Sequence, residues 1–293
     1  MSVRVTIWNK IAACVLATAA VTASWAETRS VAMVVPFAAG GPTDQLWRVI
    51  EPHINQELSR HSMKLVTEYR PGAGGMIAAN SVAQATRTTV AIFSTALVIA
   101  PVINPAAVQF APRDLVLVAY AGHSDMWVLS ARYQSAAELQ MACTSGAVTY
   151  GSSGVGSATH LFGHLVSQRL RCGQATHVPY RGQAAAVPDL QAGRLDYVVD
   201  FAGSQSARRL PFEWDGMSLQ NWHVIVANAT ADAQDLVRLQ QAFAAVKADP
   251  VRVADIQQRF SVARFAEERS TAWLQDQFVQ FARFVKPLVP GTQ

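Results

Sequence analysis

The 293-residue chain is poor in charged residues and in cysteine. Only 15% of its residues are Asp, Glu, Lys or Arg, and its 24 basic and 20 acidic residues give a formal net charge of +4. The basic residues are scattered, apart from the adjacent Arg208 and Arg209. Because a nucleic-acid-binding surface requires a clustered basic stripe, we expect no nucleic-acid partner. Beyond residue 26, no apolar run reaches the roughly 20 residues that a membrane-spanning helix requires.

The first 26 residues have the pattern of an export signal. Arg4 and Lys10 give a basic start, residues 11–23 form an apolar run, and residues 24–26 match the small-x-small cleavage pattern. We therefore expect a signal peptide over residues 1–26, its removal, and localisation of the protein in the periplasm. The alternative is an ordinary buried first helix.

The sequence has three cysteines. Cys14 lies within the expected signal and precedes its main apolar run, so we expect no lipid anchor on it. Cys143 and Cys172 each come at the end of an expected helix, just before an expected strand. In an oxidising compartment, one hypothesis is a disulfide between these two residues. Two buried free thiols are the alternative.

The rest of the chain alternates short apolar runs with amphipathic stretches, and its 51% hydrophobic content is enough for a large core. The expected strands are residues 30–37, 64–69, 90–94, 115–121, 126–130, 148–151, 177–180, 195–201 and 220–227. The expected helices are residues 43–59, 74–85, 135–141, 157–170, 184–192, 232–248, 252–260 and 271–286. Pro52 should kink or interrupt the first helix, and residues 122–125 are a candidate lobe junction. The alternation predicts parallel sheets covered by helices.

Ligands of such sheets bind outside the carboxyl ends of the strands, so we expect function in the turns that follow strands. Four of these turns are unusual: residues 35–44, 70–75, 94–96 and 151–160. In the first and the fourth, a strand ends, glycines expose the backbone, and a helix begins. Because the first N–H groups of a helix are unpaired and lie at its positive dipole end, both turns are candidate anion sites. Ordinary tight turns and helix caps are the alternative, and neither turn contains a nucleotide-binding signature.

Several motifs together carry a resemblance to a known family. They are Val34-Val35-Pro36-Phe37 with Gly40-Gly41-Pro42-Thr43-Asp44, Arg70-Pro71-Gly72-Ala73-Gly74-Gly75, Tyr150-Gly151-Ser152-Ser153-Gly154 with Gly156-Ser157 and His160-Leu161, His177-Val178-Pro179-Tyr180-Arg181-Gly182, and Gly193-Arg194-Leu195-Asp196 leading to Asp200. The chain resembles the Bordetella uptake gene (Bug) family, the substrate-binding proteins of tripartite tricarboxylate transporters. The order and spacing of the motifs follow that family through about residue 201.

The resemblance implies an α/β fold of the periplasmic binding protein type II class, with two α/β lobes and a ligand cleft between them. Residues 27–122 and 228–293 would form lobe 1, and residues 123–227 would form lobe 2. It also implies capture of a small carboxylate, often a dicarboxylate, by closure of the lobes. The partners would be membrane transporter subunits. We expect a monomer without a cofactor, a metal or enzymatic activity.

Carried over onto this sequence, the family's motifs assign ligand-binding residues to three parts of the cleft. One wall would contain Phe37, Gly40, Gly41, Thr43 and Asp44. The other wall would contain Ser152, Ser153, Gly156, Ser157 and His160, and the floor would contain Ser94, Thr95 and Asp200. For Asp44, a purely structural role in capping its helix is an equal alternative.

The chain departs from the family in three places. The segment 201–221 is too short for the helix, strand and turn that usually follow Asp200. The turn at residues 86–89 and the apolar residues 96–99 also differ from the family pattern. We therefore expect a second lobe that lacks a strand, and one altered cleft wall. These departures motivate an alternative function, a ligand-sensing or relay protein that contacts a membrane sensor domain.

Two sharper alternatives are less favoured. Ser152 and Ser153 lie near glycines, but the turn does not complete the G-x-S-x-G pattern of serine hydrolases. His160 and His164 are four residues apart on an expected helix and could both contact a metal ion. No third ligand is evident near them.

Overall fold

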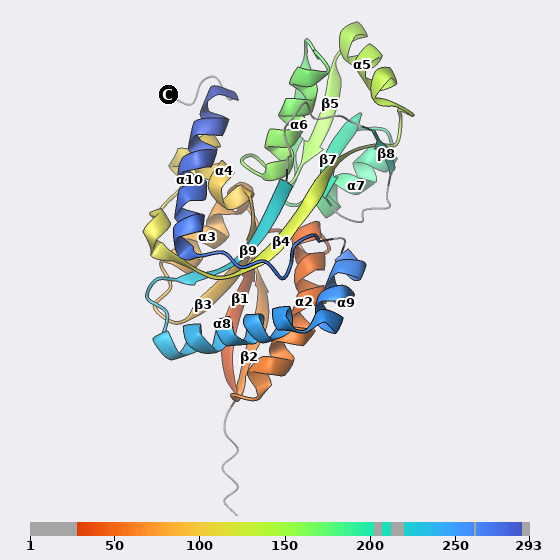
Figure 1. Cartoon of the computed structure of the whole chain (residues 1–293). Helices are drawn as coiled ribbons and strands as arrows, with labels where there is room; N and C mark the ends of the chain where they lie inside the picture. The colour runs from red at the N-terminus through yellow and green to blue at the C-terminus, as the bar shows by residue number, and fades with distance from the viewer. Residues whose placement is uncertain (1–27, 202–206, 212–219, 261, 289–293) are drawn as a thin grey trace, which may run out of the picture.

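The computed structural model describes residues 28–201, 207–211, 220–260 and 262–288. These residues form two α/β lobes joined by long strands (Figure 1). In lobe 1, β1 (Arg29–Val35) lies between the parallel strands β2 (Met63–Tyr69) and β3 (Thr89–Ser94). In lobe 2, β5 (Val148–Ser152) lies between the parallel strands β6 (Ala175–Pro179) and β7 (Tyr197–Phe201). The predicted fold class of two α/β lobes is confirmed.

Two long strands, β4 (Leu115–Ser130) and β9 (Gln220–Asn228), connect the lobes. β9 pairs antiparallel with β3 and β4, and the far end of β4 pairs with β7 of lobe 2. The prediction of two strands separated at residues 122–125 is wrong, because β4 is continuous. Its register is nevertheless shifted there. Gly122 has a φ of +83°, and a Cβ at this position would lie 2.6 Å from the carbonyl oxygen of Ala263, so the irregularity requires glycine.

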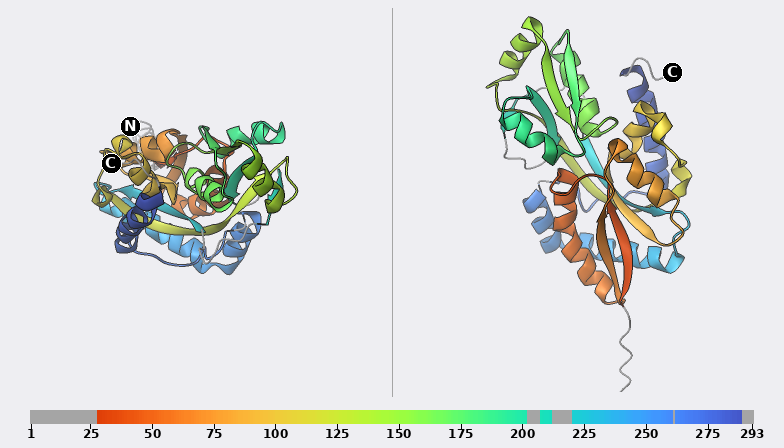
Figure 2. Two further views of the ribbon diagram at one scale, coloured as in Figure 1. Left: turned by 90° about the horizontal axis from the view of Figure 1, so that it is seen from above. Right: turned by 180° about the vertical axis from the view of Figure 1, so that it is seen from behind.

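Helices flank the sheets of both lobes (Figures 1 and 2). Those of lobe 1 are α2 (Pro42–Ser59), α3 (Met76–Ala83), α4 (Ala96–Ile103), α8 (Ala233–Ala248), α9 (Pro250–Phe260) and α10 (Thr271–Val285). Those of lobe 2 are α5 (Ala136–Ser145), α6 (Ala158–Arg169) and α7 (Gln183–Gln191). The described residues also form the short 3-10 turns η2 (Ala73–Gly75), η3 (Pro105–Ala107), η4 (Pro112–Asp114) and η5 (Lys286–Leu288).

The first helix runs without a break through Pro52, so the expected interruption is absent. The apolar face that includes Ile50 and Ile54 is fully buried in the core. Pro52 and the residue four positions before it, Arg48, are both exposed. The hydrogen bond that proline cannot donate is therefore lost on the solvent side, where water can satisfy the carbonyl of Arg48.

The helix α4 was not predicted from the sequence. Residues 96–100 are entirely buried and apolar, so they show no periodicity that distinguishes a helix from a strand. Pro101 lies inside the helix and also argues against it as a sequence signal. In the structure, α4 packs against α10, which brings the chain back onto lobe 1 (Figure 1).

A disulfide joins Cys143 and Cys172, with an S–S distance of 2.07 Å. Cys143 lies in α5 and Cys172 follows α6, and the strands after these helices, β5 and β6, are parallel neighbours. The disulfide hypothesis is therefore confirmed, and the alternative of two free thiols is wrong.

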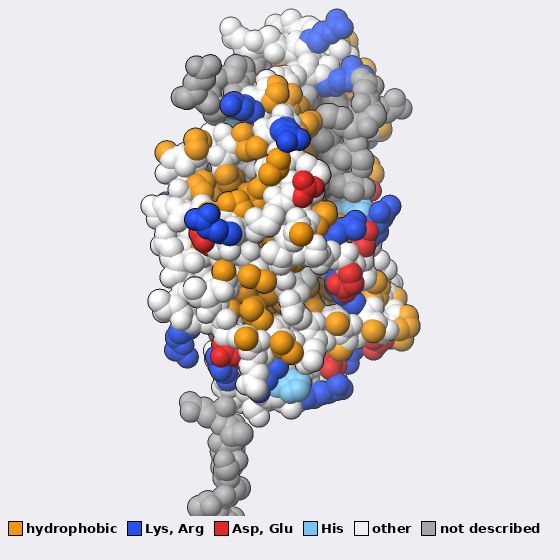
Figure 3. All heavy atoms as spheres, turned by 60° about the vertical axis from the view of Figure 1, so that its left-hand side comes forward, with side chains coloured by type: hydrophobic (Ala, Val, Ile, Leu, Met, Phe, Trp, Pro, Cys, Tyr) orange, Lys and Arg blue, Asp and Glu red, His pale blue; other side chains and the backbone are white. Residues whose placement is uncertain are grey.

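The short segment after β7 contributes a further strand to the sheet. Three residues of it form β8 (Arg208–Leu210), which pairs antiparallel with the lobe 2 end of β4. The expected export signal over residues 1–26, including Cys14, lies outside the described residues. Among the helices that the structure describes, none has the length and apolar character required to cross a membrane. On the face shown in Figure 3, basic side chains are dispersed among acidic and hydrophobic ones.

Candidate ligand-binding site

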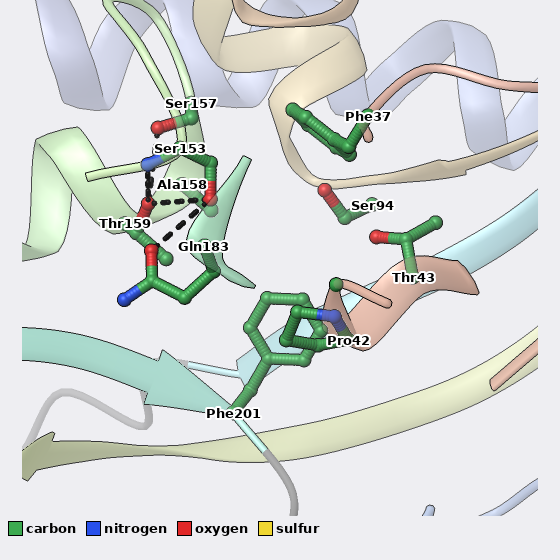
Figure 4. Close-up of a pocket in the computed structure, with 11 residues that line it drawn as sticks. Phe37, Pro42, Thr43, Ser94, Ser153, Ser157, Ala158, Thr159, Gln183 and Phe201 are labelled. Atoms are coloured by element: carbon green, nitrogen blue, oxygen red, sulfur yellow. Dashed lines mark hydrogen bonds between the residues drawn. The ribbon is translucent and has the colours of Figure 1, made fainter. Parts of the chain in front are cut away.

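A small pocket lies between the two lobes (Figure 4). Its lining residues come from both lobes, and they are Phe37, Gly41, Pro42, Thr43, Ser94, Ser153, Ser157, Ala158, Thr159, Gln183 and Phe201. The cavity volume is about 10 Å³, which is close to the space that a single water molecule requires. The walls of the pocket are therefore nearly in contact with each other.

Direct contacts between the lobes surround this pocket. The backbone N–H of Ala38 in lobe 1 donates a 3.3 Å hydrogen bond to the carbonyl oxygen of Arg181 in lobe 2. At Gly74, a Cβ would lie 2.5 Å from the carbonyl oxygen of Val155, on the opposite lobe. Because backbone meets backbone here, the lobes could not approach this closely if a side chain were present. The turn at residues 70–75 contributes no residue to the pocket lining, but it takes part in the contact between the lobes.

The amino-terminal ends of four helices converge on the pocket. Pro42 and Thr43 begin α2, Ala158 and Thr159 begin α6, and Gln183 is the first residue of α7, while Ser94 precedes the start of α4. Each end contributes unpaired backbone N–H groups and a positive dipole end. Among the described residues that line the pocket there is no Lys, Arg, His, Asp or Glu. The positive potential of the pocket therefore comes from the backbone.

The lobe 1 wall presents a hydroxyl group that has no partner. Thr43 is 1% exposed, and its Oγ1 atom makes no hydrogen bond within the described residues. In Figure 4 this hydroxyl faces the pocket, close to that of Ser94. The Oγ atom of Ser94 accepts a weak 3.4 Å hydrogen bond from the N–H of Ala96, so its own hydrogen is available. A buried hydroxyl without a partner costs about 1–3 kcal/mol, which makes Thr43 the clearest indication of a ligand.

Asp44 makes contacts of a structural kind. Its Oδ2 atom accepts hydrogen bonds from the N–H of Gly40 (2.7 Å) and from Nε of Arg48 (2.9 Å), and its Oδ1 atom accepts one from the hydroxyl of Tyr69 (2.7 Å). The hydrogen bond that Arg48 donates to Asp44 raises the pKa of Arg48. Burial, followed by the hydrogen bond to Asp44, raises the pKa of Tyr69. The carboxylate therefore fixes the loop of Gly40 on α2 and does not line the pocket.

The lobe 2 wall is a chain of hydrogen bonds between side chains (Figure 4). The Oγ1 atom of Thr159 accepts from the N–H of Ser153 (2.9 Å) and donates to the Oγ atom of Ser153 (3.2 Å). The Oγ atom of Ser153 donates to Oε1 of Gln183 (3.2 Å), whose Nε2 donates to the carbonyl of Val199 (3.2 Å). Ser157 lies 3.1 Å from the hydroxyl of Thr159 and accepts from the N–H of His160.

Two stacked imidazole rings support the turn behind this wall. The rings of His160 and His177 lie 4.0 Å apart, and burial lowers the pKa of each to about 4. Both rings are therefore neutral at neutral pH. Nδ1 of His160 accepts from the N–H of Gly156 (3.2 Å), and Nε2 of His177 lies 2.6 Å from Oγ of Ser152. Ser152 in turn accepts from the N–H of Gly154 (3.1 Å), so the two histidines hold the turn by way of its backbone.

The floor of the pocket differs from the one expected from the sequence. Phe201 lines the pocket, whereas Asp200, its neighbour on β7, is buried on the opposite face of the strand. The hydroxyl of Thr95 donates a 2.6 Å hydrogen bond to Oδ1 of Asn221 on β9 and does not line the pocket. The floor is therefore more apolar than the motifs indicate.

The structure brings six of the proposed ligand-binding residues together in the pocket: Phe37, Gly41, Thr43, Ser94, Ser153 and Ser157. The others lie behind or beside it: Gly40, Asp44, Thr95, Ser152, Gly156, His160 and Asp200. The sequence interpretation did not include Pro42, Ala158, Thr159, Gln183 and Phe201. Thr159 falls within the Gly-Ser turn that the sequence did indicate, and Gln183 directly follows the motif that ends at Gly182.

The hydrolase and metal alternatives gain no geometric support from these residues. Ser152 lies beside the imidazole of His177 but is 0% exposed, so a substrate could not reach it. Ser153 is hydrogen-bonded to the side-chain amide of Gln183 and to Thr159, and not to an imidazole. Nε2 of His164 lies 3.2 Å from the carbonyl of Leu288, whereas Nδ1 of His160 accepts from the N–H of Gly156. Within the described part of the chain, no group of three or more His, Cys, Asp or Glu residues could hold a metal ion.

Comparison with known proteins identifies the family. The model of the tripartite tricarboxylate transporter family receptor (TctC) matches residues 47–208, more than half of the chain. The chain belongs to this family. The Bug resemblance of its motifs is thereby confirmed, and the chain is a receptor of this family.

Two curated relatives show how far the similarity extends. The UPF0065 protein in the tcbD-tcbE intergenic region of Pseudomonas sp. (strain P51) is 32% identical over 185 residues, covering 61% of this chain and 54% of that protein. Protein BugT of Bordetella pertussis (strain Tohama I) is 29% identical over 185 residues, covering 60% and 55%. The matched part of the chain thus spans about half the length of each relative.

Solved structures match over nearly the whole fold. The periplasmic binding protein BugD has a TM-score of 0.78 at 23% identity, covering 89% of this chain and 97% of that chain. MatC from Rhodopseudomonas palustris with bound malate has a TM-score of 0.74 at 20% identity, covering 88% and 99%. Another R. palustris protein, with adipate, has a TM-score of 0.74 at 22% identity, covering 90% and 97%. At these identities, the likeness shows that the receptor shares their fold.

Proposed function

We propose that this receptor captures a small carboxylate in the periplasm, in the pocket between its lobes, and delivers it to a tripartite tricarboxylate-type transporter. The observation that carries the proposal is the buried, unpartnered Oγ1 atom of Thr43, which lies where four helix amino-termini converge. The location follows from the export signal expected over residues 1–26, and the delivery step follows from membership of the receptor family.

The charge balance of the pocket supports an anionic ligand. An anion is stabilised by the positive ends of helices and by unpaired N–H groups, and no acidic side chain lies among the described lining residues to repel it. A cation would find neither a carboxylate nor a favourable potential. The solved structures with malate and with adipate show that the same fold holds carboxylates in other proteins.

Binding requires the lobes to separate and then to close. The pocket of about 10 Å³ has no room for a carboxylate, so the ligand enters when β4 and β9 allow the lobes to move apart. The carboxylate would then contact the start of α2 at Thr43 and Ser94. Closure adds the start of α6 on lobe 2. Because only the ligand-bound receptor gains both sets of contacts, the ligand shifts the population toward the closed form, which the transporter would recognise.

Replacement of Thr43 by valine tests the proposal. Thr43→Val keeps the shape of the side chain and removes the hydroxyl, so a carboxylate loses one hydrogen bond to a charged group. Such a bond contributes about 1.5–3 kcal/mol, so Kd should rise about tenfold or more. The measurement is calorimetric titration of the purified protein with mono- and dicarboxylates of increasing length.

Thr144→Val is the matched control, because Thr144 is exposed on lobe 2 and its hydroxyl bonds only to the carbonyl of Met141 within α5. This control should leave Kd unchanged. Equal Kd values for the wild type and Thr43→Val would contradict the proposal, as would a wild-type protein that binds uncharged sugars in preference to carboxylates.

A further inference from the structure

The hydroxyl groups of the lobe 2 wall form a chain with a fixed direction. Nε2 of Gln183 donates to the carbonyl of Val199, and because a carbonyl only accepts, this bond fixes the amide with Oε1 toward Ser153. Ser153 must therefore donate its hydrogen to Gln183, and Thr159 donates its hydrogen to Ser153. The contact between Ser157 and Thr159 has no assigned donor. Since the hydrogen of Thr159 is already used, Ser157 is the donor.

All three hydroxyl hydrogens on this wall are thus committed within the described residues. The chain runs from Ser157 to Thr159, then to Ser153, and ends at Oε1 of Gln183. Besides the second hydrogen of Nε2 of Gln183, the side chains of this wall offer a ligand lone pairs, above all the second lone pair of Oε1 of Gln183, a residue that is 1% exposed and lines the pocket. The other donors that remain there are the backbone N–H groups at the start of α6 and of α7.

The lobe 1 wall has the opposite character. The hydroxyl of Thr43 has no partner, and that of Ser94 accepts one weak bond, so both hydrogens can be donated to a ligand. The unpaired N–H groups at the start of α2 add to these donors. One wall of the pocket therefore offers hydrogens, and the other offers lone pairs together with backbone N–H groups.

A carboxylate fits these two walls unequally. A carboxylate accepts hydrogen bonds and donates none, so it is satisfied at Thr43 but would face a lone pair of Gln183 on the opposite wall. A hydroxyl group both donates and accepts. It can donate to Oε1 of Gln183 and accept from the N–H groups that begin α6. An ammonium group would also donate, but it is repelled by the positive helix end and finds no acidic side chain among the described lining residues.

We propose that the pocket distinguishes the two ends of its ligand, binding a carboxylate at Thr43 and a neutral hydrogen-bond donor, a hydroxyl group, at Gln183. This proposal rests on the proposed function and narrows the ligand class to hydroxy acids. Phe37, Pro42 and Phe201 line the pocket between the two polar walls (Figure 4). The ligand therefore carries an apolar chain or ring between its polar ends.

Calorimetric titration with matched ligands tests this inference. Each set keeps one carboxylate and one spacer and varies the far end: adipate, 6-hydroxyhexanoate and hexanoate in one set, and terephthalate, 4-(hydroxymethyl)benzoate and 4-methylbenzoate in the other. In the set whose spacer fits, the hydroxy acid should bind about tenfold more tightly than both the dicarboxylate and the methyl analogue. A dicarboxylate that binds as tightly as the hydroxy acid, or more tightly, overturns the inference and leaves carboxylate capture intact. Absence of binding by every carboxylate overturns both.

The Gln183→Met variant reverses the expected preference. Methionine has a similar length, and without Oε1 the hydrogen of Ser153 becomes available to the ligand. Affinity for the dicarboxylate relative to the hydroxy acid should therefore rise about tenfold compared with the wild type. Gln84→Met, on the exposed end of α3, should leave the preference unchanged.

A second variant covers the case in which Gln183→Met fails to fold. Gln183→Leu also removes Oε1, in a shorter side chain, so that the hydrogen of Ser153 again becomes available to the ligand. It should shift the preference in the same direction. If a folded variant of either kind keeps the wild-type preference, the direction of the hydrogen-bond chain does not determine specificity and the inference is wrong.

Discussion

Acidification should destabilise the protein through the stacked histidines behind the Gly-Ser turn. Burial lowers the pKa of His160 and His177 to about 4, whereas an unfolded histidine titrates near 6.5. Between these two values the unfolded chain binds protons that the folded chain does not. The contribution of each neutral ring to stability is therefore complete above about pH 6.5 and is lost as the pH falls toward 4.

The size of the effect follows from the two pKa values. At pH 5, each histidine lowers the free energy of unfolding by about 2 kcal/mol relative to pH 8, and the pair lowers it by about 4 kcal/mol. Asp189 and Asp255, whose pKa values are lowered by hydrogen bonds from Tyr180 and from His53, lose their contributions only below the ordinary carboxyl pKa of 3.8. The interval from pH 8 to pH 5 therefore isolates histidine.

Urea unfolding at pH 8 and pH 5 measures this loss, with His177→Phe as the informative variant. Phenylalanine keeps a ring between Tyr150 and His160 and has no group to titrate. The variant should be less stable at pH 8, because Ser152 loses its hydrogen bond to the imidazole of His177. When the pH falls from 8 to 5, the decrease in its free energy of unfolding should be about 2 kcal/mol smaller than the decrease in the wild type.

The control is His61→Asn, which alters an exposed histidine at the end of α2 and should reproduce the wild-type loss. A free energy of unfolding that is equal at pH 8 and pH 5 in the wild type would refute the reasoning. The reasoning would also be refuted if the free energy of unfolding of His177→Phe decreased between pH 8 and pH 5 by as much as that of the wild type.

Two further predictions concern lobe contact and the disulfide. Gly74→Ala places a Cβ 2.5 Å from the carbonyl of Val155 on the other lobe, so carboxylate affinity should fall about tenfold or more, as measured by calorimetry. Gly193→Ala is its control, because Gly193 has a similar φ (+70° against +64°) but open surroundings, and equal affinities for the two variants would contradict the lobe-contact role. Replacement of Cys143 and Cys172 by alanine opens a loop with a sequence separation of 29, which should lower the free energy of unfolding in urea by about 3–4 kcal/mol without changing carboxylate affinity. A loss below about 1 kcal/mol would contradict the loop-entropy argument.

The turns of the site were predictable from the sequence because their chemistry is local. A strand, a glycine and a helix start within ten residues identify a helix amino-terminus, and this pattern correctly located Thr43, Ser153 and Ser157 near the pocket. The disulfide was one of two alternatives, and the expected oxidising compartment together with the order of helices and strands made it plausible. Periodicity was informative for α2, whose exposed and buried faces are distinct, but not for α4, whose first residues are all buried.

The direction of individual side chains was not predictable, because it depends on partners far away in the sequence. The hydroxyl of Thr95 donates a hydrogen bond to Asn221, which is 126 residues later in the chain. Because the hydroxyl is directed toward Asn221, Thr95 does not line the pocket. Along β7 a shift of one residue moves a side chain to the other face, which places Phe201 and not Asp200 in the pocket. Gln183 shows no sequence signal of its own, since its role arises from the carbonyl of Val199 on a neighbouring strand.

Binding of a carboxylate compared with its own amide tests the central claim most directly. The purified protein would be titrated with hexanoate, 6-hydroxyhexanoate and adipate, and in parallel with the corresponding primary amides. The account predicts that the best-bound acid binds about tenfold or more tightly than its amide, because the unpartnered hydroxyl of Thr43 and the helix ends recognise the negative charge. Equal affinities for an acid and its amide would contradict the account.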